Sequence, residues 1–408
     1  MELFIQMGHN MQALALEHLE EFDGGTIIIS PMNILPNKVK GYATRVHKKK
    51  GKVLVDPQLY YPRQYQKKLS QYAYWPKSDI TSLEMGQFDT VVEELSKLNN
   101  EVEAEAFLLP SITAKKIDDL WNKIQKIIIE SAKKYAPDMK YIHTISLSSD
   151  VLNDESQIER VIEYVEEWDV EGVYIVCEHP ERYYLVDRPL WVSNIMSLVA
   201  GIKRQRKMTI VGYASHQLFI NVLKDPKDVI TNIRKCDAIA SGNFLNLRWF
   251  QPEHFETIDD KQPSRRAVWY YCPQALSEYK IPFLDIAKRM DLLDRIEPPV
   301  TMKNKYSEML FNGSLPSSTG FGEKEAFRHY LYCLHKQCQN SVLETYAETK
   351  NLHVLMLETA EQLLSGLGKK GIKGQDRDFT EILDVNRAAI SAFDMAYHFP
   401  LSQEWNEL

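Results

Sequence analysis

The chain has 408 residues, of which 44% are hydrophobic and 26% charged, and its formal net charge at pH 7 is −7. This length accommodates one large α/β domain and a smaller appendage, and the composition is ordinary for a soluble globular protein. No run approaches the ~18 apolar residues of a membrane span, and the first residues lack the basic and apolar segments of a signal peptide. Five cysteines, an odd number, indicate free thiols in a reducing compartment. We therefore expect a cytoplasmic protein that does not enter a membrane.

Runs of strand-forming residues that end in polar residues alternate with amphipathic helices along most of the chain. Continuous apolar runs predict strands that are buried on both faces, as in a parallel sheet covered by helices. Six clear runs and two weaker ones bring the count to eight, which predicts a (β/α)8 TIM-type barrel whose chemistry lies where the strands end. The runs cover residues 26–31, 52–63, 104–111, 141–150, 172–180, 209–215, 237–248 and 267–273, of which 104–111 and 267–273 are the weaker two.

The helices between these runs are recognised by apolar residues at three- and four-residue spacing. Such stripes predict helices near 117–128, 150–169 and 190–207, and the barrel is expected to end near Pro298–Pro299. A loop rich in Gly and Ser follows at Asn312–Gly322, and the chain then becomes helical, with a second helix over Asn351–Leu367. We therefore expect a barrel over residues 1–312 and a C-terminal helical region over 313–408 packed on it.

A basic tract stands out in this acidic chain. Residues 38–77 contain eleven Lys or Arg and one acid, Asp56, and the second half of the tract is rich in tyrosine. Cations that meet phosphates and rings that stack on bases are typical of single-strand nucleic-acid binding. The alternative is a solvated helix followed by aromatic residues that pack on the barrel. The residues expected to bind nucleic acid are Lys48, Lys49, Lys50, Arg63, Tyr65, Lys67 and Lys68.

Polar residues at the predicted strand ends are the candidate site. Asp56 follows three apolar residues and precedes a proline, so its carboxylate is a candidate general base. Gln58 lies two residues on and is a candidate for hydrogen bonding to substrate. Glu178 and His179 follow the fifth run and suit proton transfer, although adjacent residues of a strand point to opposite faces. For each, a purely structural role, such as capping the next helix, is the alternative.

Further candidates follow the later runs. His216 and the series Asn243, Asn246 and Arg248 are candidates for substrate binding, because amide and guanidinium groups bind phosphate or carboxylate. Ordinary loop hydrogen bonding is the alternative. Cys177 is more typical of a small buried hydrophobe than of a nucleophile.

Neither a metal nor a cofactor is expected. The segment Gly366–Arg377 is glycine-rich, but Ile372 stands where the phosphate loop needs a lysine. On one predicted helix, His329 and Cys333 are four residues apart, whereas the other two members of the cluster lie elsewhere around it. Structural zinc usually takes ligands from a knuckle or from two separated elements. This cluster consists of His329, Cys333, His335 and Cys338.

Three stretches together carry a resemblance to a known family. They are the run Cys236–Arg248, the helical stretch Phe327–Leu357, and Asp56 at a strand end. The segment from Thr209 to Leu367 resembles the tRNA-guanine transglycosylase superfamily, including its DNA-guanine transglycosylase relatives. In that family a Cys-Asp or Val-Asp dipeptide and two apolar residues precede the nucleophilic aspartate, and an arginine ends the loop. Asp56 matches the aspartate of the family's Asp-Ser-Gly-Gly-Phe-Gln motif.

The chain departs from the family pattern at several positions. Ala240 stands at the nucleophile's position, and a shifted register would offer Asp237 instead. The residues after Asp56 are Pro57–Tyr61 rather than Ser-Gly-Gly-Phe-Gln, and the zinc-binding cysteine cluster is absent. The resemblance therefore supports the fold better than the reaction.

Three hypotheses about function follow. The first is a base-exchange enzyme for guanine or 7-deazaguanine in tRNA or DNA, with Asp56 and Asp237 as candidate nucleophiles and Glu178 or His179 assisting. The second is a catalytically inactive relative that binds nucleic acid or a partner subunit, a second copy of the chain included. The third is an unrelated TIM-barrel enzyme that acts on a small phosphorylated substrate, since fold does not fix function.

Overall fold

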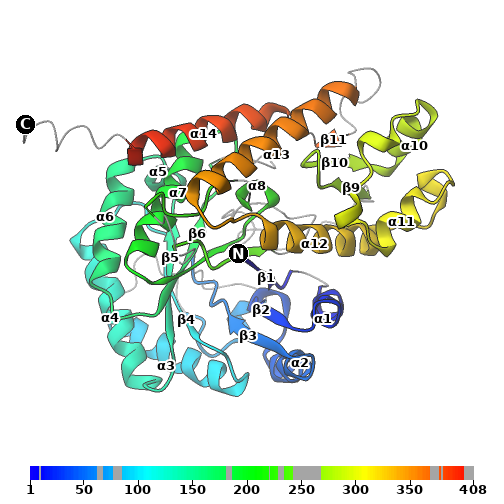
Figure 1. Ribbon diagram of the computed structural model, residues 1–408. Coiled ribbons are helices and arrows are strands. Elements are labelled where there is room, and N and C mark those ends of the chain that lie inside the picture. Colours follow the sequence, from blue (N-terminus) through cyan, green and yellow to red (C-terminus); the bar gives the residue numbers. More distant parts are fainter. Residues whose placement is uncertain are drawn as a thin grey trace, which may run out of the picture.

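A parallel barrel ringed by helices forms the larger part of the molecule (Figure 1). The computed structural model describes residues 1–8, 11–61, 68–76, 85–180, 186–219, 221–227, 234–241, 268–367, 376–377 and 380–398. Eight strands make one sheet in the order β3-β2-β1-β8-β7-β6-β5-β4. They are β1 (Glu2–Gln6), β2 (Gly25–Ile29), β3 (Gly51–Val55), β4 (Phe107–Leu109), β5 (Tyr141–Leu147), β6 (Gly172–Cys177), β7 (Met208–Gly212) and β8 (Ala238–Ser241).

The sheet curls round on itself. The strands that come first and last in the sequence, β1 and β8, pair in parallel, with Leu3 opposite Ile239. Between β3 and β4, the amide N–H of Glu105 donates to the carbonyl oxygen of Val53 at 2.9 Å. The barrel is therefore nearly closed, and the predicted (β/α)8 TIM-type fold is confirmed.

One barrel strand differs from the prediction. The run at 267–273 forms β9 (Trp269–Cys272), which pairs antiparallel with β10 (Ser277–Lys280) in a separate three-stranded sheet. The eighth barrel strand is instead β1, at the start of the chain. An aromatic, β-branched run predicts a strand but not its partner, whereas β1 is a short run without a preceding turn signal. The last barrel strand consequently ends at Ser241, well before Pro298.

The helices around the barrel contribute buried apolar side chains to the core. In α4 (Asp119–Tyr135) the residues Ile128, Ile129 and Ala132 are buried, and the Asp118 side chain caps the helix by accepting from the amide of Trp121. The stretch expected as one helix over 150–169 is two helices, because Asp154 caps a new start after Asn153. The others are α1 (Gln12–Glu21), α2 (Pro36–Lys48), α3 (Met85–Glu101), α5 (Ser149–Leu152), α6 (Glu155–Glu166), α7 (Pro189–Arg204) and α8 (His216–Phe219).

The C-terminal helices return to the barrel (Figure 1). Helix α12 packs against β1 and α1, and α14 lies along both α13 and α7. Within the described residues, no helix is both long enough and apolar enough to cross a bilayer. The elements of this region are α10 (Ile281–Arg289), α11 (Lys305–Phe311), α12 (Glu323–Asn340), α13 (Tyr346–Leu367), β11 (Asp376–Arg377) and α14 (Thr380–His398).

Candidate active site

Asp56 lies at the carboxyl end of β3 and is completely buried, with 0% of its surface exposed. Its carboxylate accepts four hydrogen bonds. The Tyr60 hydroxyl (2.6 Å) and the Gln58 amide N–H (3.0 Å) donate to Oδ1. The Gln6 side-chain amide (3.2 Å) and the Tyr213 hydroxyl (3.1 Å) donate to Oδ2. Both carboxylate oxygens are therefore fully engaged by neutral donors.

Residues of three further strands surround the Asp56 carboxylate. Gln6 ends β1, Tyr174 lies within β6, and Tyr213 follows β7. The Gln6 Nε2 donates to the Tyr174 hydroxyl (3.1 Å) as well as to Asp56, while its Oε1 accepts from the Tyr213 amide N–H (2.9 Å). A backbone N–H can only donate, so this bond fixes which way the Gln6 amide points. Gly212 leaves room for this arrangement, because a Cβ there would lie 2.3 Å from the Tyr174 hydroxyl oxygen.

Two residues that contact Asp56 have strained backbones. Gln58 has φ = 57° and Tyr213 has φ = 53°, both in the left-handed region that L-residues other than Asn and Asp rarely adopt. Each is held by hydrogen bonds, since the Gln58 Oε1 accepts from the Met32 amide (2.9 Å) and Gln6 binds the Tyr213 amide. Strain of this kind costs about 1–3 kcal/mol per residue, and six other described residues of the chain, Lys50 among them, share this backbone conformation.

The electrostatics of the cluster favour a protonatable carboxyl. Burial raises the pKa of Asp56 from 3.8 to about 6, and the bonds from Tyr60, Gln58, Tyr213 and Gln6 oppose that rise only in part. No Lys or Arg within the described ranges forms an ion pair with it. Burial, and to a smaller degree the charge of Asp56, raises the pKa of the tyrosine hydroxyls far above the usual value, so the phenols stay neutral.

Glu178 and His216, also predicted as site residues, contact residues outside this cluster. The Glu178 Oε2 accepts from the Ser149 amide (3.1 Å) at the start of α5. His179 is buried, and His216 is buried at the start of α8 with its ring 5.0 Å from that of Tyr271. Of the predicted residues that the structure describes, Asp56 and Gln58 are the two that share this hydrogen-bonded cluster. Asn243, Asn246 and Arg248 lie outside the described residues.

Asp237 lies at the opposite end of the barrel from Asp56. It directly precedes β8, and its Oδ2 accepts from the Lys203 Nζ (2.7 Å) and from the Thr209 amide N–H (2.8 Å). Ala240, the position that the family resemblance gives to the nucleophile, is buried within β8 and carries no reactive group. The two candidate nucleophiles, Asp56 and Asp237, are therefore not neighbours.

Strand β3 divides the predicted basic tract. Lys48, Lys49 and Lys50 precede the strand, whereas Asp56 follows it, and five strand residues span roughly 17 Å. Lys49 pairs with Glu20, and Lys50 pairs with Asp23 at 2.5 Å. Lys68 is half-buried. Arg63, Tyr65 and Lys67 lie outside the described residues.

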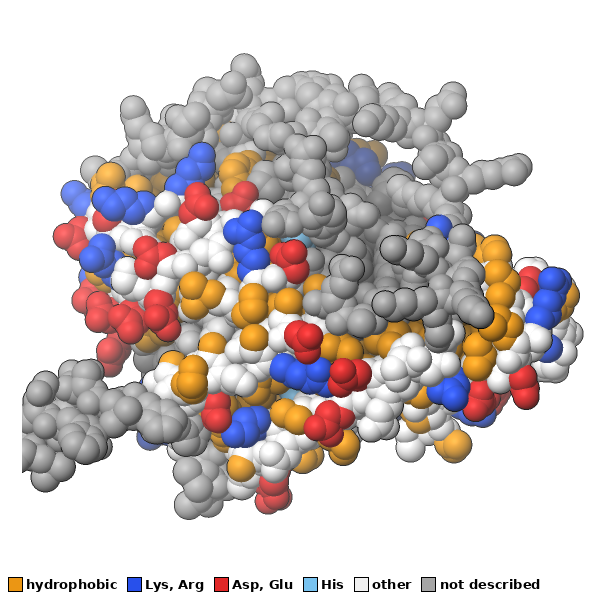
Figure 2. Space-filling model, turned by 90° about the horizontal axis from the view of Figure 1, so that it is seen from above, with side chains coloured by type: hydrophobic (Ala, Val, Ile, Leu, Met, Phe, Trp, Pro, Cys, Tyr) orange, Lys and Arg blue, Asp and Glu red, His pale blue; other side chains and the backbone are white. Residues whose placement is uncertain are grey.

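The aromatic half of the tract is largely packed into the protein. The buried rings are those of Tyr60, Tyr72, Tyr74 and Trp75, and the Tyr72 and Tyr74 hydroxyls bind backbone carbonyl oxygens. These four rings offer no surface on which unpaired bases could stack. On the face seen in Figure 2, acidic and basic side chains lie among one another rather than in one continuous positive area.

Of the residues considered as metal ligands, His329 and Cys333 are in contact, with 3.6 Å between Nε2 and Sγ, whereas His335 has another partner. The His329 Nε2 bonds the Tyr271 carbonyl (2.8 Å), whereas the His335 Nδ1 lies 3.1 Å from the His18 Nε2. All five cysteines are buried free thiols. In the part of the chain that the structure describes, no group of three or more His, Cys, Asp or Glu side chains is placed to hold a metal ion.

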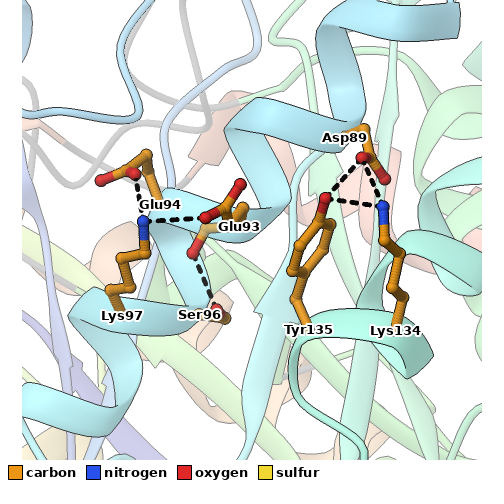
Figure 3. Close-up of polar contacts among 7 residues, drawn as sticks. All are labelled: Asp89, Glu93, Glu94, Ser96, Lys97, Lys134 and Tyr135. Carbon is orange, nitrogen blue, oxygen red and sulfur yellow. Dashed lines mark hydrogen bonds and ion pairs between the residues drawn. The ribbon is translucent and has the colours of Figure 1, made fainter.

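A groove of about 720 Å³ lies on the outer side of the helical ring and is lined by residues of α3, α4 and α6. Its Asp89 side chain already has partners: it accepts from Lys134 (2.9 Å) and from the hydroxyl of the neighbouring Tyr135 (2.5 Å), as Figure 3 shows. Nearby on α3, Lys97 pairs with Glu93 and Glu94. The groove does not include Asp56, and the Asp56 cluster remains the better candidate for chemistry.

No family model matches the chain, and no curated protein matches it. Solved structures resemble it weakly. An uncharacterized conserved protein from Geobacillus kaustophilus is 10% identical, with 62% of this chain and 96% of that chain covered and a TM-score of 0.33. An HpcH/HpaI aldolase from Desulfitobacterium hafniense is 9% identical (60% and 88% covered, TM-score 0.35). An N-acetylneuraminate lyase from Mycoplasma synoviae is 11% identical (88% and 97% covered, TM-score 0.32). Likeness at this level assigns no activity.

Proposed function

We propose that the protein is a TIM-barrel enzyme in which Asp56 serves as a general acid–base toward a small polar substrate, phosphorylated compounds included. The observation that carries this proposal is the buried Asp56 carboxyl, held by four neutral donors at the carboxyl end of β3. Reactions of TIM barrels take place at that end of the strands.

The chemistry follows from the environment of the carboxyl. Because its pKa is raised to about 6, Asp56 both gains and releases a proton near neutral pH. A salt bridge would have held it ionised, but its described partners are uncharged amides and phenols. Two strained residues, Gln58 and Tyr213, hold the surrounding groups in place.

Deuterium uptake tests this proposal and does not require the substrate to be identified first. The protein is incubated in D2O with a mixture of small polar metabolites, and mass spectrometry records compounds that gain deuterium or are converted. We expect the wild type to label or convert one class of compound. Asp56→Asn should reduce that rate about 10²- to 10⁴-fold. Equal labelling by both proteins, or none by either, would contradict the proposal.

A double variant separates chemistry from folding. In Asp56→Asn the new amide N–H group faces the Gln6 Nε2, which is also a donor, so the variant carries a mismatch. Gln6→Glu in the same chain supplies an acceptor there and moves the carboxylate from β3 to β1. The double variant should regain stability but not activity. Recovery of activity with stability would mean that the position of the carboxylate is unimportant.

Nucleic-acid binding is the second candidate, supported by the exposed face of α2. Its cations Lys38, Lys40 and Lys48 form no ion pair with described residues, and α2 contains no acid. Between them lies Gly41, where an added Cβ would meet nothing within 4 Å. Glycine inside an exposed helix costs about 1 kcal/mol relative to alanine, and close approach of a phosphate backbone would account for it. In this reading the partner is tRNA or DNA, and base exchange at Asp56 is the associated reaction.

Binding at two salt concentrations tests this candidate. Labelled tRNA, duplex DNA and single-stranded DNA are titrated with the wild type and with Lys40→Ala/Lys48→Ala. Loss of two phosphate contacts should lower the slope of log K against log salt by about 2. Lys126→Ala/Lys133→Ala on α4 makes the same charge change and should bind like the wild type. Incorporation of labelled guanine would extend the result to base exchange, and equal binding by both double variants would remove α2 from the interface.

A further inference from the structure

Within the Asp56 cluster, burial separates one residue from the others. Asp56, Gln6, Gln58, Tyr60 and Tyr174 are all buried, whereas Tyr213 is only half-buried. A substrate arriving at the cluster would therefore meet the Tyr213 side chain before it met the carboxyl.

We propose that Tyr213 is the catalytic residue that touches the substrate and relays a proton between it and Asp56. This inference rests on the proposed function of Asp56 and adds the residue through which that carboxyl acts. The Tyr213 hydroxyl donates to the Asp56 Oδ2 at 3.1 Å, which is the bond along which the proton would move.

Besides its bond to Asp56, Tyr213 is held by two hydrogen bonds and one ring contact. Its hydroxyl oxygen accepts from the Gln58 Nε2 at 3.1 Å, and its backbone N–H donates to the Gln6 Oε1 at 2.9 Å. The Tyr60 ring packs edge-on against it, with ring centres 6.0 Å apart and an interplanar angle of 82°. The left-handed backbone at residue 213 aims the side chain toward β3, although its own strand, β7, is not a neighbour of β3 in the sheet.

The other two phenols are not placed for this role. Tyr60 donates the shortest bond to Asp56, at 2.6 Å, but it is 1% exposed, and Tyr174 is 0% exposed. Both therefore tune and position the carboxyl from inside the barrel. They serve as matched controls, because Tyr60→Phe removes the same kind of bond to the same carboxyl as Tyr213→Phe does.

The proton transfer balances without a further reactant. When a substrate O–H, or a C–H beside a carbonyl, gives up its proton to the Tyr213 oxygen, the phenolic proton passes to the Asp56 Oδ2. The electron pair of the broken bond stays on the substrate, and Asp56 becomes a neutral acid. The reverse sequence returns a proton, and in D2O it returns a deuteron. Because Tyr213 gains and loses a proton together, it carries no lasting charge.

The test compares three tyrosine variants in the deuterium assay across pH. Tyr213→Phe should lose at least 10²-fold in labelling rate at every pH. Tyr60→Phe and Tyr174→Phe should stay within about tenfold on their own pH plateaus. Tyr60→Phe should also move the rise of activity to higher pH, because losing a bond to the carboxylate raises the pKa of Asp56.

Each outcome has a distinct meaning. If Asp56→Asn is inactive but Tyr213→Phe labels like the wild type, the relay is wrong and the proposed function stands. If Tyr60→Phe loses as much as Tyr213→Phe on its plateau, the phenols act only by tuning the carboxyl, and the relay is again wrong. If Asp56→Asn labels normally, the proposed function itself fails.

A near-isosteric replacement covers the case in which Tyr213→Phe does not fold. 3-Fluorotyrosine at position 213 keeps the hydroxyl and lowers its pKa, so it should change the labelling rate and shift its pH profile. The same substitution at position 141, where the tyrosine hydroxyl donates to the Ala136 carbonyl oxygen at 2.7 Å outside the cluster, should leave the plateau rate unchanged. An unchanged profile with fluorotyrosine at position 213 would overturn the relay.

Discussion

Asp56 and Asp237 lie at opposite ends of the same barrel, and the protein surrounds them with different groups. Asp237 precedes β8 and accepts from the Lys203 ammonium at 2.7 Å, so its charge is balanced. Asp56 follows β3 and accepts from amides and phenols only, as far as the described residues extend. Asp237 thus forms an ion pair with a cation, whereas the pKa of Asp56 is raised to about 6.

This difference follows the general division of labour in such barrels, in which the amino ends of the strands contribute stability and the carboxyl ends contribute reactions. Asp237 forms a salt bridge with Lys203, whereas burial among neutral donors raises the pKa of Asp56 to about 6. The same side chain therefore serves as a structural anchor at one end and as a candidate acid–base group at the other. Four predictions test this contrast.

The largest expected effect is a pH dependence of stability that originates at Asp56. The pKa of Asp56 is about 6 in the folded protein and 3.8 in the unfolded chain, so the folded state binds more protons between these values. The free energy of unfolding should therefore decrease by about 3 kcal/mol in all as pH rises from about 3 to 7, with about 2 kcal/mol of this between pH 4 and 6. Urea denaturation of the wild type and Asp56→Asn across this range measures it.

The difference between the two proteins isolates this contribution from that of other carboxyls. Below about pH 4 both forms of position 56 are uncharged, and above about pH 6 only the wild type buries a charge. A difference in unfolding free energy that stays constant from pH 4 to 7 would show that Asp56 is not perturbed, and the contrast with Asp237 would lose its basis.

Asp237→Ala should destabilise the protein by about 2 kcal/mol, because it leaves the buried Lys203 ammonium without its partner. The Lys203 side chain is 7% exposed and that of Asp237 is 37% exposed, so water compensates part of the loss. Labelling at the Asp56 site should not change in the folded variant. Adding Lys203→Met should restore most of the stability. A loss of labelling in a stable Asp237 variant would instead favour Asp237 as a reacting group.

The fold could be predicted from the sequence because strand runs and helices repeat locally. Seven of the eight predicted runs are barrel strands, and Asp56 was placed correctly at a strand end. The eighth run, at 267–273, forms a strand, but the prediction that it belongs to the barrel was wrong. Its antiparallel pairing with β10 depends on contacts that the run itself does not encode. Strand β1 was missed because no turn signal precedes its short apolar run.

The partners of Asp56 could not be predicted for a related reason. Gln6 ends the strand that was missed, and Tyr174 lies inside an apolar run that indicates only a buried core. Tyr213 follows β7 and lies 157 positions from Asp56 in sequence, so only the closed barrel brings them together. The predicted run at 209–215 extends past Tyr213, so the sequence did not place this tyrosine at the end of the strand. Lys48 to Lys50, conversely, are neighbours of Asp56 in sequence but not in space.

Exchanging the groups at positions 6 and 56 should show an intermediate effect. Gln6→Glu alone places a second carboxyl within bonding distance of Asp56, and Asp56→Asn alone creates a donor–donor contact, so each should destabilise the protein by about 1–2 kcal/mol. Together they restore complementary pairing. A double-mutant cycle in urea should give a coupling free energy of at least about 1 kcal/mol. Additive effects would mean that the bond between Gln6 and Asp56 contributes little to holding the site.

The smallest effect should come from the exposed cations at the amino end of β3. Lys50 pairs with Asp23 at 2.5 Å, but 70% of the Lys50 side chain and 81% of the Asp23 side chain remain exposed. Exposed pairs contribute about 0–1 kcal/mol, because water and salt screen them. Lys50→Ala should therefore change the unfolding free energy by less than about 0.5 kcal/mol, and less at 0.5 M salt than at 0.05 M. A larger loss that does not depend on salt would indicate that the amino end of the barrel depends on its surface charges. In that case the buried pair between Lys203 and Asp237 would not be the feature that distinguishes this end from the Asp56 end.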